Sequence, residues 1–136
     1  MIKIAIIDDI PTVATVCEKL LIQKNAITNE DIFDKFTNSR AFLQAFHHWG
    51  INHYDLVICD HHLEENEDIS GYDLLMHIQI LGYKNFAVLY SADNEALNDI
   101  SLIVDKHKID LLSKDQPGNT ESIDHITDII REIKGF

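Results

Sequence analysis

The sequence is poor in cysteine and in positive charge. Its two cysteines, Cys17 and Cys59, are too few for a disulfide framework in a chain of this length, and they favour a reduced compartment. Only 11 Lys and Arg stand against 23 Asp and Glu, which gives a formal net charge of -12 at pH 7. Because a nucleic-acid surface requires clustered Lys and Arg, we do not expect this chain to bind nucleic acid directly.

Long hydrophobic runs are also lacking. No stretch approaches the roughly 18 apolar residues of a membrane span, and Asp8 and Asp9 interrupt the apolar start of the chain, unlike a signal peptide. We therefore expect a cytoplasmic protein without membrane contact. The 46% of hydrophobic residues can form a packed core, and 136 residues suit one domain that spans residues 1–136.

Short apolar runs alternate with longer segments of helical period. Runs this short and this rich in Ile and Val are typical of strands that are buried on both faces. The runs are Ile2–Ile7, Ile32–Phe36, Leu56–Cys59, Phe86–Tyr90 and Ile109–Leu112. The helical segments are marked by Val13, Val16, Leu20 and Leu21; by Phe42, Leu43 and Phe46; by Leu74, Leu75, Ile78 and Leu81; by Leu97, Ile100, Ile103 and Val104; and by Ile123, Ile126, Ile130 and Ile133.

Five repeats of strand then helix predict an α/β fold. Because parallel strands need crossovers that pack back onto the sheet, the pattern indicates a doubly wound, five-stranded parallel sheet with five helices on its two faces. Ligands of such sheets bind beyond the carboxyl ends of the strands. The residues that follow each apolar run are therefore the candidate site.

Acidic, hydroxyl and ammonium groups follow four of the runs. Asp8 and Asp9 follow the first, Asp60 the third, Ser91 the fourth, and Lys114 the fifth. Three carboxylates together raise one another's pKa, and a hard divalent cation such as Mg²⁺ relieves this repulsion. Carboxylates can act as nucleophiles that form aspartyl phosphates, so the group is a candidate site for phosphoryl transfer.

These strand ends resemble those of a known family. The order Ile-Ile-Asp-Asp, Leu-Val-Ile-Cys-Asp, Leu-Tyr-Ser-Ala and Leu-Leu-Ser-Lys is similar to the receiver domain of two-component response regulators, over nearly the whole chain. The resemblance implies a flavodoxin-like sheet with strand order 2-1-3-4-5. It also implies a phosphorylation-dependent signalling switch, not a turnover enzyme, whose phosphoryl donor is a sensor histidine kinase or a phosphotransfer protein.

The resemblance assigns the acceptor and the cation. Asp60 would accept the phosphoryl group. Mg²⁺ (or Mn²⁺) would be held by Asp8, Asp9, Asp60 and the backbone carbonyl of His62. Lys114 would contact the phosphoryl group.

The resemblance also assigns residues around the acceptor. Ser91 would be the switch hydroxyl that closes toward the phosphate. His62 and Asp93 would flank the acceptor and tune how fast water hydrolyses the aspartyl phosphate. The fourth helix, fifth strand and fifth helix would offer a surface for a homodimer.

Two positions depart from the family pattern. Leu111 occupies the switch position where the family often has Tyr or Phe, so an aromatic flip is excluded and readout rests on Ser91 and the loop after the fourth strand. Asp115 follows Lys114 where proline is usual, which leaves the isomer of that peptide bond open. The Lys-Asp pair is similar to receivers of helix-turn-helix transcription factors.

Several alternatives stay open. The chain could be a receiver-like interaction or dimerisation module that no longer relies on phosphate, or the excised receiver of a DNA-binding transcription regulator. A phosphatase with an aspartate nucleophile is disfavoured, because His62 stands where such enzymes have a second acid. A zinc site at His61 and His62 is disfavoured, because no third ligand has suitable spacing. Phe46 and Trp49 are expected to pack the second helix and not to bind a ligand.

Overall fold

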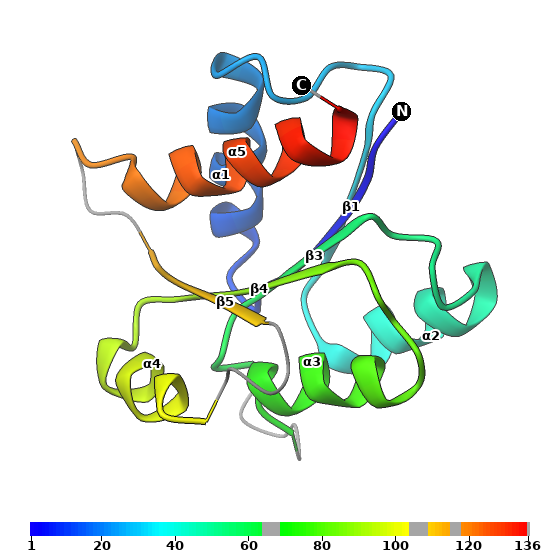
Figure 1. The fold of residues 1–136 in the computed structure, drawn as a ribbon, viewed down its shortest axis with the longest axis vertical. Helices are drawn as coiled ribbons and strands as arrows, with labels where there is room; N and C mark the ends of the chain where they lie inside the picture. The colour runs from blue at the N-terminus through cyan, green and yellow to red at the C-terminus, as the bar shows by residue number, and fades with distance from the viewer. Residues whose placement is uncertain (64–68, 104–108, 115–117, 136) are drawn as a thin grey trace.

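The computed structural model describes residues 1–63, 69–103, 109–114 and 118–135. Along them, five strands alternate with five helices, as Figure 1 shows. The elements are β1 (Lys3–Ile7), α1 (Pro11–Gln23), β2 (Ile32–Phe36), α2 (Ser39–Trp49), β3 (Leu56–Cys59), α3 (Gly71–Ile80), β4 (Phe86–Ser91), α4 (Asn94–Ser101), β5 (Ile109–Ser113) and α5 (Glu121–Lys134).

The strands form one parallel sheet in the order β2-β1-β3-β4-β5. In the register, Ile4 of β1 pairs with Phe33 of β2 on one side and with Leu56 of β3 on the other. The strand order reverses between β1 and β3, so the chain winds outward in both directions from the centre. The predicted fold class and strand order are therefore confirmed.

Helices cover both faces of the sheet, with α1 and α5 on one face and α2, α3 and α4 on the other (Figure 1). The alternation of side chains along β1 explains this, because successive residues of a strand point to opposite faces. Ile4 and Ile6 pack in the cluster with α1 and α5, while Ala5 and Ile7 pack in the cluster with α2, α3 and α4. The two apolar layers fix the sheet between them.

Burial of strands on both faces holds for the three inner strands only. Every residue of β3 is buried, and β1 and β4 are buried except for partial exposure of their first residues. The edge strands β2 and β5 are largely half-buried. Their apolar runs are similar in sequence to those of the inner strands, so the runs do not reveal which strands lie at an edge.

Three residues that mark helical segments in the sequence, Val16, Leu81 and Ile103, are exposed. Val16 is 53% exposed, because α1 turns Ala14, Cys17 and Leu21 toward the sheet instead. Ile103 is 58% exposed, because α4 ends at Ser101 and leaves it outside the helix. Val104, assigned to the same helix, lies outside the described residues.

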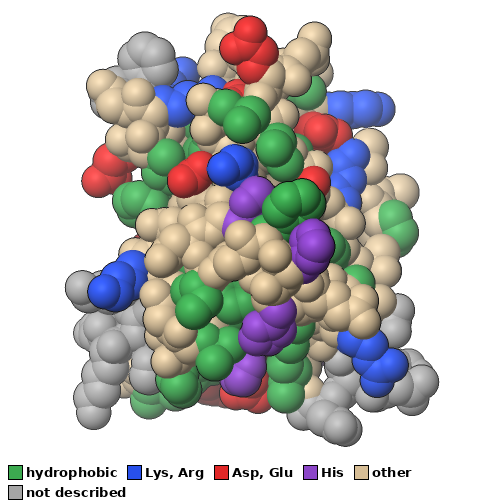
Figure 2. Space-filling view, turned by 90° about the vertical axis from the view of Figure 1, so that its right-hand side faces the viewer, with side chains coloured by type: hydrophobic (Ala, Val, Ile, Leu, Met, Phe, Trp, Pro, Cys, Tyr) green, Lys and Arg blue, Asp and Glu red, His purple; other side chains and the backbone are tan. Residues whose placement is uncertain are grey.

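Trp49 also differs from expectation. Phe46 is fully buried as predicted, but Trp49, the last residue of α2, is 59% exposed. Its ring stacks on that of His53 at a centroid distance of 5.2 Å and contacts the ring of His48 edge-on. Figure 2 shows histidine side chains beside hydrophobic ones on one face of the molecule.

None of the described helices combines the length and the apolar character that crossing a membrane would require.

A part-buried ion pair joins the end of α5 to the start of the sheet. The Asp31 side chain, 4% exposed, accepts hydrogen bonds from the backbone amides of Ile2 (2.9 Å) and Thr28 (2.8 Å). Its Oδ2 also lies 2.7 Å from Nζ of Lys134, which donates a further hydrogen bond to the carbonyl of Ala26. One carboxylate therefore joins the first strand, the loop before β2 and the last helix.

Replacing Asp31 with Ala is expected to lower the free energy of unfolding by about 2–3 kcal/mol, because a half-buried ammonium and two amides lose their acceptor. Burial raises the pKa of Asp31, but the hydrogen bonds from Lys134, Ile2 and Thr28 more than offset this, so the pKa lies below its usual value of 3.8. A lowered carboxyl pKa stabilises the fold above the unfolded-state value and loses that effect as the pH falls through the folded-state value.

Urea unfolding between pH 7 and pH 3 measures the difference between wild type and Asp31→Ala. The difference should be full at neutral pH and should shrink below about pH 4. Asp124→Ala is the matched control, since it breaks the exposed Lys24–Asp124 pair and should leave stability close to wild type. A stability difference that persists unchanged at pH 3 would contradict the role of the ionised carboxylate.

Candidate functional site

The predicted site residues meet at the carboxyl edge of the sheet. Asp8 directly follows β1 and Asp60 directly follows β3, and the Asp60 amide donates to the carbonyl of Ile7 at 2.9 Å. Ser91 is the last residue of β4, and its carbonyl accepts from the amide of Lys114 at 2.9 Å. Sheet hydrogen bonds therefore continue to the residues of the site and fix their backbone.

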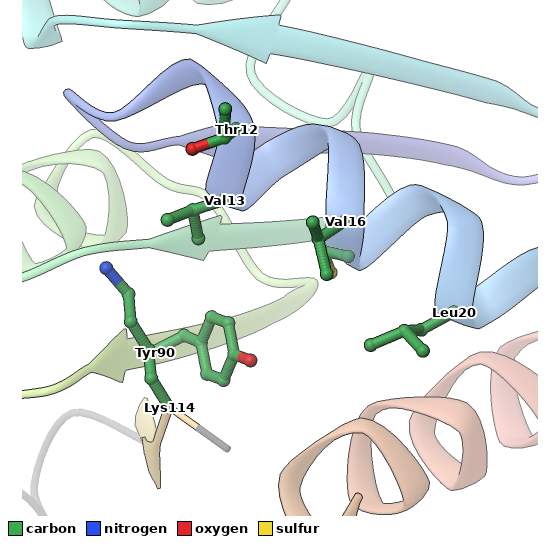
Figure 3. Close-up of a pocket in the computed structure, with 7 residues that line it drawn as sticks. Thr12, Val13, Val16, Leu20, Tyr90 and Lys114 are labelled. Carbon is green, nitrogen blue, oxygen red and sulfur yellow. The ribbon is translucent and has the colours of Figure 1, made fainter. Parts of the chain in front are cut away.

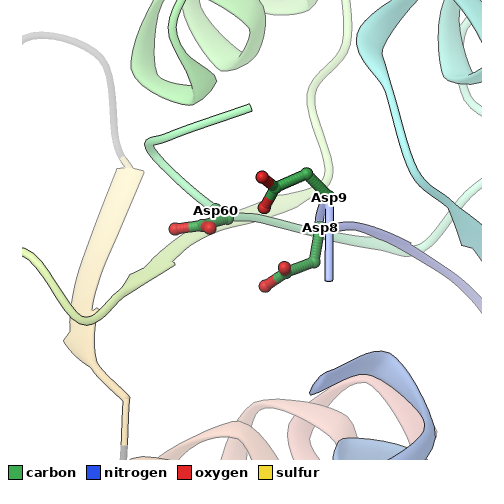
Figure 4. Close-up of side chains that lie close together, drawn as sticks. All are labelled: Asp8, Asp9 and Asp60. Atoms are coloured by element: carbon green, nitrogen blue, oxygen red, sulfur yellow. The ribbon is translucent and has the colours of Figure 1, made fainter. Parts of the chain in front are cut away.

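Three carboxylates converge there. Asp8, Asp9 and Asp60 each place a carboxylate oxygen within 4.8 Å of the others (Figure 4). Asp8 and Asp60 are only 2% and 6% exposed. Burial raises the pKa of Asp8, hydrogen bonds from Lys114 and the Ile10 amide counteract this in part, and the nearby charge of Asp60 raises it again, so the pKa lies above 3.8.

Lys114 bridges two of these carboxylates. Its Nζ lies 2.8 Å from Asp8 Oδ2 and 3.2 Å from Asp60 Oδ2. Burial lowers the pKa of Lys114, but the hydrogen bond to Asp8 and the charges of Asp60 and Asp8 more than offset this, so its pKa lies above the usual value. One ammonium against three carboxylates leaves the cluster negative, and this oxygen donor set fits a hard divalent cation.

Ser91 lies at the same edge but faces its own loop. Its side chain is 1% exposed, and its Oγ accepts a hydrogen bond from the amide of Asp93 at 3.1 Å. The hydroxyl thus holds the turn between β4 and α4. Its predicted role as a switch toward a phosphoryl group stays a prediction.

The two flanking residues contact each other. Nε2 of His62 lies 2.5 Å from Oδ2 of Asp93, while Oδ1 of Asp93 accepts from the amide of Ala96 and caps α4. The hydrogen bond from His62 is the main reason that the pKa of Asp93 lies below 3.8, and the Ala96 amide adds to it. The roles of His62 in hydrolysis and, through its backbone carbonyl, in cation binding stay predictions.

Three further predictions concern residues around this cluster. Leu111 of β5 is half-buried and packs against the core on the side of α2, α3 and α4, and its switch role is untested. Of the described residues, the group that gathers three potential metal ligands is the aspartate trio, and His61 and His62 do not belong to it. Asp115 and its bond to Lys114 lie outside the described residues.

Gly71 is a site residue that the sequence did not reveal. It begins α3 after the capping residue Ser70, and its amide donates to the carbonyl of His61 at 2.8 Å. A Cβ at this position would lie only 1.7 Å from the carbonyl oxygen of Asp60 and 2.9 Å from Cα of His61. Only glycine allows α3 to start this close to Asp60, and a glycine after a serine cap is too common a pattern to signal it.

A groove opens beside the carboxylates. It has a volume of about 200 Å³ and runs along α1, as Figure 3 shows. Lys114 contributes to both the groove and the carboxylate cluster, and the exposed Val16 contributes to its wall. The lining residues are Thr12, Val13, Val16, Cys17, Leu20, Tyr90 and Lys114.

Solved receiver domains share this architecture. A response regulator receiver domain protein from Clostridium thermocellum is 21% identical, with a TM-score of 0.72 and 98% of each chain covered. The BeF3-activated DrrB receiver domain is 19% identical, with a TM-score of 0.67, over 96% of this chain and 98% of that one. RcsB from Salmonella enterica serovar Typhimurium, bound to promoter rprA in the presence of phosphomimetic BeF3-, is 18% identical, with a TM-score of 0.69, over 99% of this chain and 75% of that one.

No protein-family model and no curated protein matches the sequence. The likeness to solved structures nevertheless covers the whole chain and the whole of the smaller receiver structures. The chain has the fold of response-regulator receiver domains, and the resemblance noted in the sequence is confirmed at this level.

Replacing Gly71 with Ala is expected to displace Asp60 or the start of α3, because the new Cβ would overlap the Asp60 carbonyl. Overpacking of this kind should lower the free energy of unfolding by about 1–3 kcal/mol. We expect Mg²⁺ to stabilise wild type by binding the aspartate trio, since a ligand that binds only the folded site raises stability, and we expect Gly71→Ala to lose this effect. Urea unfolding with and without Mg²⁺ measures both effects.

Gly50→Ala is the matched control. Gly50 has a φ of 105°, so alanine there is strained, but no atom lies within 4 Å of the added Cβ. This variant should lose stability and still respond to Mg²⁺. An unchanged Mg²⁺ response in Gly71→Ala would show that the contact with Asp60 does not position the site.

Proposed function

We propose that this chain is a phosphorylation-dependent signalling switch whose phosphoryl group is accepted by Asp60. The observation that carries the proposal is the buried Asp60 carboxylate, which lies against the Lys114 ammonium beside two further aspartates at the carboxyl edge of a receiver fold. A carboxylate in this setting is a nucleophile with positive charge already in place for the incoming phosphoryl oxygens.

The reaction transfers a phosphoryl group from a histidine of a sensor kinase or a phosphotransfer protein. An oxygen of Asp60 forms the new bond to phosphorus, the bond from phosphorus to the histidine nitrogen breaks, and that nitrogen keeps the electron pair and takes up a proton. Lys114 would pair with a phosphoryl oxygen in the product. Mg²⁺ or Mn²⁺, held by Asp8, Asp9, Asp60 and the carbonyl of His62, would neutralise phosphoryl charge.

The groove along α1 is our candidate for the binding site of the donor protein. It adjoins Lys114, so a protein that lies in it has its surface beside the acceptor. Its walls are largely apolar, and Ile10 before α1 and Val16 within it are 50% and 53% exposed. Exposed apolar side chains around a groove are typical of a protein contact.

Phosphorylation alone is expected to shift the equilibrium between the inactive and active conformations only in part. A hydrogen bond to a charged group contributes about 1.5–3 kcal/mol, which shifts an equilibrium by one to two orders of magnitude, whereas full conversion needs roughly 10⁴-fold. Binding of a partner, or of a second copy at the surface of α4, β5 and α5, would supply the rest. RcsB, bound to promoter rprA in its solved structure, is an example of a longer regulator that contains a similar fold.

Incubation with acetyl phosphate and Mg²⁺, followed by intact-mass measurement, tests the acceptor. Wild type should gain one phosphoryl group that hydroxylamine removes, as expected for an acyl phosphate, and Asp60→Asn should gain none. Asp73→Asn, which alters an exposed aspartate of α3, is the control and should behave as wild type. An adduct that survives Asp60→Asn would refute the assignment.

A second candidate function is a receiver-like interaction module that no longer depends on phosphate. The apolar Leu111 at the readout position favours it. Beryllofluoride with Mg²⁺ distinguishes the two, because a phosphate-dependent switch binds this phosphoryl mimic and a fixed module does not.

A further inference from the structure

Asp93 connects three parts of the site through three hydrogen bonds. Its amide donates to Oγ of Ser91 at 3.1 Å, and its Oδ1 accepts from the amide of Ala96 at 2.9 Å. Its Oδ2 contacts Nε2 of His62, two residues after Asp60 in sequence. One residue thus touches the proposed switch serine, the first turn of α4 and the loop that follows the acceptor.

The same turn of α4 is also held from the side of β5. Oγ of Ser113 donates to Oδ1 of Asn94 at 2.8 Å, and Ser113 directly precedes Lys114. The carbonyl of Ser113 in turn accepts a hydrogen bond from Oγ of Ser122 in α5. The start of α4 therefore contacts both the segment after Asp60, through His62, and the end of β5 before Lys114, through Ser113. A displacement of either segment would be transmitted to the first turn of α4.

The contact between His62 and Asp93 is suited to opening and closing. The His62 side chain is 65% exposed and that of Asp93 33% exposed, and ion pairs and hydrogen bonds at such positions are weak. The other hydrogen bonds of Asp93, with Ser91, Ala96 and Leu97, are short-range contacts within its own turn and the start of α4. Breaking the contact with His62 therefore releases the turn from the acceptor loop without unfolding α4.

We propose that the His62–Asp93 contact is a latch that holds the first turn of α4 in the arrangement of the unphosphorylated protein. Asp93 is then the positioning residue through which Ser91 acts on α4. When the Ser91 hydroxyl turns toward a phosphoryl group on Asp60, it leaves the Asp93 amide, and the latch opposes this movement. The inference rests on the proposed function, and it concerns how the phosphoryl group is read and not how it is transferred.

Affinity for beryllofluoride in the presence of Mg²⁺, measured by titration, tests the latch. His62→Ala should bind about two- to fivefold more tightly than wild type, the factor that corresponds to loss of one exposed pair. Asp93→Asn keeps a good helix cap but weakens the latch, so its affinity should rise in the same direction. The double variant should bind no more tightly than His62→Ala, because both changes remove one contact.

Exchange of the Ala96 amide with deuterated solvent, followed by NMR in the unliganded protein, is the second measurement. The Ala96 amide is bonded to Asp93 and not to His62, so it reports only what passes through Asp93. It should exchange faster in His62→Ala than in wild type. His77→Ala, which removes an exposed histidine of the last turn of α3, is the control and should change neither measurement.

Two results would overturn the latch. One is additive effects of His62→Ala and Asp93→Asn on affinity, or weaker binding in His62→Ala. The other is unchanged exchange of the Ala96 amide in His62→Ala. If wild type fails to bind beryllofluoride, the phosphoacceptor function is refuted, and the exchange of Ala96 alone decides whether the latch exists.

Discussion

The ammonium of Lys114 lies between the buried carboxylates of Asp8 and Asp60, and the rest of the site depends on this contact. Two carboxylates with almost no access to solvent repel each other, and burial penalises their ionised forms. The fold tolerates them because Lys114 reaches them from the end of the edge strand β5, and because sheet hydrogen bonds continue through the backbone at Asp60 and at Ser91. The rigid backbone of the strands thus keeps the carboxylates of Asp8 and Asp60 close together despite their mutual repulsion.

Such a cluster lowers the stability of the fold. The pKa of Asp8 lies above its usual value, chiefly because of burial, and a raised carboxyl pKa means that the folded state disfavours the ionised carboxylate. Other contacts compensate at the opposite end of the sheet, where Asp31 accepts hydrogen bonds from Lys134 and from two backbone amides. In the described part of the chain, the charge of Asp31 is therefore balanced by Lys134, whereas Asp8, Asp9 and Asp60 together carry more negative charge than Lys114 balances.

Much of the fold follows from the sequence, because the apolar runs are short and polar residues end them abruptly. The runs Ile32–Phe36 and Leu56–Cys59 coincide with β2 and β3, and the acids that follow the runs meet as predicted. Which residues of a helix face the core was harder to predict. A period of 3.6 residues allows neighbouring stripes on α1, and the exposed Val16 differs from the buried Cys17 by one residue.

Contacts between loops were beyond the reach of sequence patterns. The close approach of Gly71 to Asp60 depends on the angle at which α3 enters, and the contact between His62 and Asp93 joins residues 31 positions apart. Nothing local to either residue encodes its partner. The family resemblance assigned His62 and Asp93 to the surroundings of the acceptor, but it did not reveal that their side chains contact each other.

The tie between Asp31, Ile2 and Lys134 has a practical consequence. It gathers the first and last elements of the described chain at the amino edge of the parallel sheet, while the carboxylates lie at the carboxyl edge. A fluorophore or a surface anchor attached near Ile2 or Lys134 would therefore sit a full strand length from the acceptor. Immobilised or labelled protein can be exposed to phosphoryl donors with that edge unobstructed, and a circular permutation that joins these neighbouring elements would leave the acceptor edge intact.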